Sequence, residues 1–67
     1  MDFGQRLKSL RVERNLTQQN LGDAVGVSTV TIRAWERNTK KPAMDALLSL
    51  GRVLNISMDT LLDFHLN

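Results

Sequence analysis

The chain contains no cysteine and no tyrosine, and it has only one proline, one histidine and three aromatic residues. Without cysteine, neither disulfides nor a thiolate metal site can supplement the core. The apolar runs are far too short to cross a bilayer and no signal peptide is visible, so we expect a cytoplasmic protein without membrane contact. No nucleophile–base set or metal-ligand cluster is present, so we expect no catalytic residues, no metal and no cofactor.

The chain is short and its charge is unevenly distributed. With 67 residues and 42% hydrophobic content, residues 1–67 are expected to form a single domain near the lower size limit for folding on its own core. Residues 1–41 hold eight of the nine Lys and Arg against four carboxylates, a net +4, whereas residues 42–67 carry a net −2. The basic part suggests a surface for a polyanion, but charge alone does not distinguish this from ordinary solvation.

A start signal for a helix occurs three times. Each instance has an apolar residue, a Ser or Thr cap, and a second apolar residue five positions after the first: Leu16–Thr17–Leu21, Val27–Ser28–Ile32 and Ile56–Ser57–Leu61. This spacing is that of the hydrophobic staple, in which the hydroxyl accepts a free N–H of the first turn. It predicts helices over about 17–25, 28–37 and 57–64. Because Asn20, Thr31 and Thr60 replace the usual Glu or Gln, no full capping box is expected.

Two further helices follow from apolar stripes. Residues 2–14 carry Phe3, Leu7 and Leu10 on one face, and residues 43–54 carry a broader face of Met44, Leu47, Leu48, Gly51 and Leu54. Asn15 and Asn55 are the expected left-handed stops of these helices. Met44 and Met58 are expected to fill the core or its edge. Because no β-type alternation is present, we predict an all-α fold, a compact five-helix bundle.

The segment from Gln18 to Arg37 is the most informative part of the chain. Leu21 and Val25 share one face of a first helix, Ile32 and Trp35 share a face of a second, and Gly26 lies at the turn between them. A helical wheel on Ile32 places four side chains within an arc of ~100° facing away from the core. These side chains are Val30, Arg33, Ala34 and Arg37. A small, basic, exposed helix face is typical of a protein that enters the major groove of DNA.

At these residues the chain resembles the XRE-like helix-turn-helix domains of the Cro and lambdoid phage repressor type. The resemblance covers nearly all of residues 3–62. It is carried, in the family's order and spacing, by LKSLRVERNLTQQNLGDAVGVS, IRAWER and KKPAMDALLSLGRVLNISMDTLL. It implies a lambda repressor-like DNA-binding domain that usually acts as a twofold dimer on a pseudo-palindromic operator.

The resemblance also implies site residues. It assigns base contacts to Thr29, Val30, Arg33 and Ala34 and a phosphate contact to Gln18. Phosphate contacts are also expected from the residues after the recognition helix: Arg37, Asn38, Thr39, Lys40 and Lys41. Asn38 stands where the family usually has glycine, and asparagine also tolerates the left-handed conformation. Glu36 lies only ~40° from Ile32 on the wheel, facing inward, and the resemblance pairs it with Arg11 as a structural salt bridge.

The predicted partner is a double-stranded DNA operator, bound by a homodimer that is weak or monomeric when free. Phe64 and Leu66 exceed what a short last helix can bury, so we assign them to the dimer interface, unless the chain is a fragment and they lead into a missing oligomerisation domain. The favoured function is a phage or prophage repressor or Cro-type regulator. A restriction–modification controller, an antitoxin of the same fold and a protein-interaction module without DNA binding stay open.

Overall fold

The computed structural model describes residues 2–62, which form five helices. The helices are α1 (Phe3–Glu13), α2 (Gln18–Val25), α3 (Thr29–Glu36), α4 (Met44–Leu54) and α5 (Met58–Leu62). No strand occurs in these residues, so the predicted all-α five-helix fold is confirmed. Every helix begins within one residue of its expected start, and residues 63–64 of the last expected helix lie outside the described part. Within that part, no helix has the length and apolar character needed to span a bilayer.

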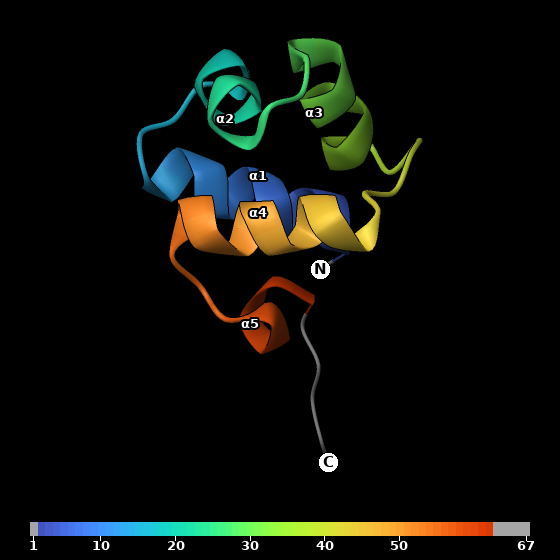
Figure 1. Ribbon diagram of the computed structural model, residues 1–67. Coiled ribbons are helices and arrows are strands. Elements are labelled where there is room, and N and C mark those ends of the chain that lie inside the picture. The colour runs from blue at the N-terminus through green and yellow to red at the C-terminus, as the bar shows by residue number, and fades with distance from the viewer. Residues whose placement is uncertain (1, 63–67) are drawn as a thin grey trace.

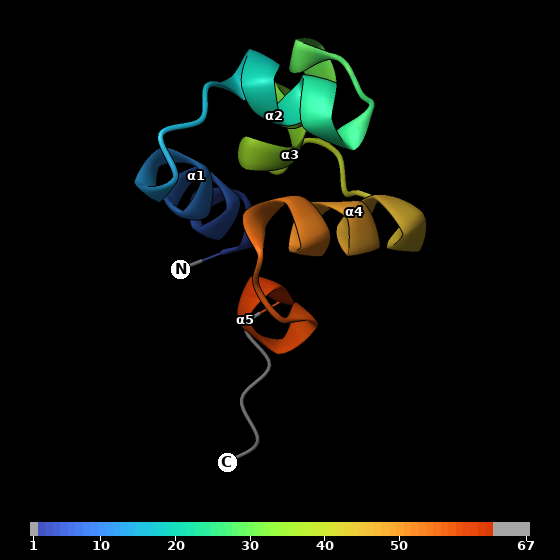
Figure 2. The ribbon, with the colours of Figure 1, turned by 60° about the vertical axis from the view of Figure 1, so that its left-hand side comes forward.

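The helices are arranged on three levels (Figures 1 and 2). α1 and α4 occupy the middle level, α2 and α3 lie on one side of them, and α5 lies on the other. α3 packs on both α1 and α2, α2 also packs on α4, and α5 contacts α1 and α4. The α2–α3 pair is therefore supported from below and stands on the side of the molecule opposite to α5.

The core contains at least one side chain from every helix. Its buried members are Leu7, Leu21, Ile32, Trp35, Leu50, Leu54 and Leu61. Half-buried apolar side chains, among them Met58 as expected, pack against this cluster. Because full burial of a leucine side chain contributes about 1.5–3 kcal/mol, this small cluster supplies much of the stability of the fold.

The apolar face of α4 is rotated from the face that the sequence predicted. Leu50, absent from the prediction, is fully buried beside Leu54, whereas Met44 is 64% and Leu48 is 49% exposed. At 100° per residue, Met44 and Leu48 lie about 80° and 120° from Leu54, whereas Leu50 is only about 40° away. The assignment of Met44 and Leu48 to the core was therefore wrong.

The predicted caps are present, and one is stronger than expected. The hydroxyls of Thr17, Ser28 and Ser57 each accept a hydrogen bond from the backbone N–H three residues further on, at 2.9–3.2 Å. At α2 the Asn20 side chain also accepts a hydrogen bond from the Thr17 N–H at 3.1 Å. The expectation of no full capping box was thus wrong here, because an asparagine oxygen reaches the same N–H that Glu or Gln usually caps.

The ends of α1 and α4 follow from their polar residues. Asn15 and Asn55 adopt positive φ angles of 58° and 56°, as predicted for the helix stops. At the start of α1, Asp2 accepts a hydrogen bond from the Gln5 N–H at 2.8 Å. This bond, followed by one from the Asn38 side chain, lowers the pKa of Asp2 below its ordinary value. The cap is therefore fully formed above that ordinary value and is lost as the pH falls through the lower folded value.

Candidate nucleic-acid interface

The turn between α2 and α3 fixes the angle of the exposed helix. Gly26 ends α2 with a φ of 88°, a left-handed conformation that glycine adopts without steric cost, as the sequence predicted. The N–H groups of Gly26 and Val27 both donate to the Gly22 carbonyl oxygen at 2.8 Å. Because the half-buried Val27 side chain packs against the core at this corner, α3 leaves the turn in one orientation.

One face of α3 is anchored and the opposite face is open. Ile32 is fully buried and Trp35 is 5% exposed, so Trp35 is a core residue. On the opposite face Val30 is 68% exposed, and Arg33 is also exposed. Thr29 and Ala34 are half-buried at the margins of this face. An exposed β-branched residue beside an exposed arginine matches the donor and methyl pattern of a base pair edge in the major groove.

The predicted phosphate-binding segment after α3 folds back onto the last turn of that helix. Its residues 37–41 are all exposed. The Ala34 carbonyl oxygen accepts from the backbone N–H of Thr39 at 3.0 Å, from that of Lys40 at 3.4 Å and from the Thr39 hydroxyl at 3.2 Å. The structure therefore holds Arg37, Lys40 and Lys41 on one short segment beside the open face of α3.

Asn38 has a structural task that the sequence did not reveal. It adopts the predicted left-handed conformation with a φ of 62°, and its Oδ1 accepts from the Gly4 N–H at 3.0 Å. A Cβ at position 4 would lie 2.3 Å from the Glu36 carbonyl oxygen, so only glycine allows this close approach of α1 to α3. The contact joins the start of α1 to the end of the candidate recognition helix.

The predicted salt bridge between α1 and α3 is present. Arg11 Nε donates to Glu36 Oε2 at 2.6 Å and Arg11 Nη2 donates to Glu36 Oε1 at 3.2 Å. The two side chains are 10% and 5% exposed, so the pair is nearly removed from water. Gln18, which was expected only to meet a phosphate, also donates from Nε2 to Glu36 Oε1 at 3.1 Å. Three helices are thus joined at one carboxylate.

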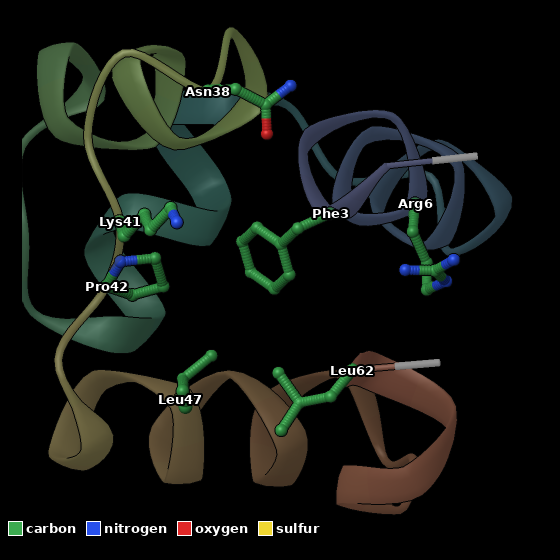
Figure 3. Close-up of a pocket in the computed structure, with 7 residues that line it drawn as sticks. All are labelled: Phe3, Arg6, Asn38, Lys41, Pro42, Leu47 and Leu62. Carbon is green, nitrogen blue, oxygen red and sulfur yellow. The ribbon is translucent and has the colours of Figure 1, made fainter. Parts of the chain in front are cut away.

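A cavity of about 390 Å³ lies between α1, the segment after α3, α4 and α5 (Figure 3). Its walls are mainly apolar, and cationic and amide groups stand at its rim; the lining residues are Phe3, Arg6, Asn38, Lys41, Pro42, Leu47 and Leu62. No carboxylate, histidine or hydroxyl lines it, so the lining holds no nucleophile or general base. The candidate site is therefore the open face of α3 with its flanking basic segment.

A helix-turn-helix family model matches residues 7–61. The repressor protein C2 of Salmonella phage P22 is 41% identical to this chain over 60 residues, which are 90% of this chain and 28% of the repressor. The crystal structure of the P22 c2 repressor in complex with a synthetic operator superposes with a TM-score of 0.88 at 39% identity, covering 92% of this chain and 94% of that chain.

A second solved structure is the restriction–modification controller protein C.AhdI from Aeromonas hydrophila. It has a TM-score of 0.85 at 30% identity, covering 90% of this chain and 91% of that chain. The chain spans about half, or less, of the length of the curated relatives it matches. The match of the family model and of these two structures extends over α1 to α5, and the chain belongs to the helix-turn-helix family, of the XRE type that its sequence resembles.

Proposed function

We propose that this chain is a sequence-specific DNA-binding transcriptional regulator that inserts α3 into the major groove. The observation that carries the proposal is the two-sided α3, buried through Ile32 and Trp35 and open at Val30 and Arg33. Arg33 is suited to donate two hydrogen bonds to guanine O6 and N7, and Val30 to contact a thymine methyl group. Thr29 and Ala34 border the same face and complete the base-reading set.

Phosphate contacts position the protein on the duplex but carry no base information. We assign them to Arg37, Lys40 and Lys41 on the exposed segment after α3, together with its neighbours Asn38 and Thr39. Gln18 lies at the start of α2 and supplies a neutral contact. The charges on this segment favour association with any DNA, so the discrimination between sequences rests on the open face of α3.

We propose a homodimer on DNA, because one recognition helix covers too few base pairs to single out an operator. Two copies related by a twofold axis would place their α3 helices about 34 Å apart, on one face of the duplex. The predicted interface residues Phe64 and Leu66 lie outside the described residues. The similarity to a repressor in complex with a synthetic operator supports the DNA partner.

Within this function, a phage or prophage repressor of the C2 type is favoured by the identity to the P22 protein. A restriction–modification controller is the second candidate, since the C.AhdI structure shares the arrangement of helices. A pure protein-interaction module is disfavoured, because Arg33 and Arg37 are exposed and basic rather than acidic or bulky.

Selection of bound sequences from a random pool of duplex DNA tests the proposal. We expect enrichment of a pseudo-palindromic motif whose half-sites are about 10 base pairs apart, centre to centre, which also reports the dimer. The unselected pool, and a pool carried through without protein, serve as controls. Uniform recovery of all sequences would contradict sequence-specific binding, and a single unpaired half-site would contradict the dimer.

A further inference from the structure

Gln18 and Glu36 lie 18 positions apart in the chain and meet across the helix-turn-helix unit. The Gln18 Nε2 group in the first turn of α2 donates to Glu36 Oε1 at the end of α3, at 3.1 Å. Gln18 is half-buried, whereas its neighbour Gln19 is exposed and has no side-chain hydrogen bond within residues 2–62. Two adjacent glutamines on one helix are therefore held very differently.

Glu36 is itself held rigidly. Its two carboxylate oxygens accept from Arg11 Nε and Nη2, and Arg11 Nη1 donates to the Leu16 carbonyl oxygen at 2.7 Å. Leu16 lies in the loop that leads into α2, so the guanidinium of Arg11 bridges α3 to the start of α2 through Glu36 and Leu16. A paired carboxylate at 5% side-chain exposure has little freedom to move away from Gln18.

This contact affects what Gln18 can offer a ligand. A primary amide carries two N–H donors, and a carboxylate accepts but does not donate. One N–H of Nε2 is therefore held by Glu36, and the second stays available in a side chain that already occupies one rotamer. Fixing a free glutamine on binding costs conformational entropy equivalent to about a two- to tenfold loss of affinity, and Glu36 removes most of that cost beforehand.

We propose that Glu36 is a positioning residue for DNA binding: it holds the Gln18 amide so that its second N–H meets a phosphate of the duplex. The inference rests on the proposed function, since it needs DNA as the ligand. It assigns the buried Arg11–Glu36 pair a role in affinity besides its role in joining α1 to α3.

A double-mutant cycle in DNA binding tests this role. Gln18→Ala should weaken binding about tenfold on both a selected operator and random DNA, as for loss of a hydrogen bond to a charged group. The salt dependence should keep its slope, because a neutral amide releases no counterion. Gln19→Ala is the matched control, and we expect it to change affinity less than twofold. In a Glu36→Gln background, the effect of Gln18→Ala should shrink to about threefold or less.

A measurement on the wild-type chain covers the case in which Glu36→Gln fails to fold. In the free protein, NMR should show the Gln18 side-chain amide as ordered, with slower proton exchange than that of Gln19. Equal mobility and exchange of the two amides would overturn the proposal, as would a Gln18→Ala effect equal to that of Gln19→Ala. A wild-type protein that binds no DNA at all would overturn the proposed function instead, whatever the NMR result.

Discussion

Removal of the Glu36 carboxylate is the perturbation with the largest expected effect on stability. In Glu36→Ala, Arg11 keeps one of its three hydrogen bonds, the one to the Leu16 carbonyl oxygen, and loses both bonds to Glu36. Arg11 is 8% exposed, so water cannot replace the missing acceptor without opening the contact between α1 and α3. The variant therefore leaves a buried charge without a counterion.

The expected cost follows from this geometry. Breaking a buried ion pair by removing one partner destabilises a protein by about 3–5 kcal/mol. A domain of this size has a total stability of only about 3–10 kcal/mol. At about 4–8 °C per kcal/mol, the thermal midpoint should fall by at least about 12 °C.

Thermal and urea unfolding followed by circular dichroism measure this cost. Glu13→Ala is the control, because Glu13 makes an ion pair with Arg14 at 3.6 Å while its side chain is 68% exposed, and such pairs contribute about 1 kcal/mol at most. The double variant Arg11→Met with Glu36→Leu should recover part of the loss, since it removes the unpaired charge. Equal effects of Glu36→Ala and Glu13→Ala would refute the reasoning.

Three further outcomes are expected. Gly4→Ala should cost about 1–3 kcal/mol in urea unfolding, because its Cβ would overlap the backbone of α3, and a neutral result would show that α1 shifts freely. Ala43→Ser should add about 1 kcal/mol and raise the thermal midpoint, since position 43 caps α4 without a side-chain hydrogen bond; an unchanged midpoint would count against this. Lys40→Ala with Lys41→Ala should lower affinity for all DNA sequences and flatten the salt dependence by about 0.9 slope units for each phosphate that the variant no longer neutralises, whereas an unchanged slope would exclude both lysines from the interface.

The local features of the fold were predictable from the sequence. Helix starts and stops depend on short-range groups such as the Ser28 hydroxyl and the left-handed Asn15 and Asn55, so their positions were right to within a residue. The inward position of Glu36 followed from its angle to Ile32. Its partner Arg11 came from the family resemblance, and the structure confirms the pair.

The features that were missed depend on interactions between distant segments. The bond from Gly4 to Asn38 spans 34 positions and that from Gln18 to Glu36 spans 18, and neither leaves a local pattern. The rotation of α4 had the same origin. Leu50 and Leu48 are equally apolar, and only the packing of α2 and α5 against α4 decides that Leu50 is buried.

The central claim is that α3 reads base edges, and Arg33→Ala tests it most directly. Affinities of the wild type and the variant are compared on the selected operator, on operators with each base pair changed in turn, and on random DNA. The account predicts a loss of about 1–3 kcal/mol on the operator, relaxed discrimination at one G·C position, and little change on random DNA. An equal loss on operator and random DNA, with discrimination intact at every position, would make Arg33 a phosphate contact and contradict the account.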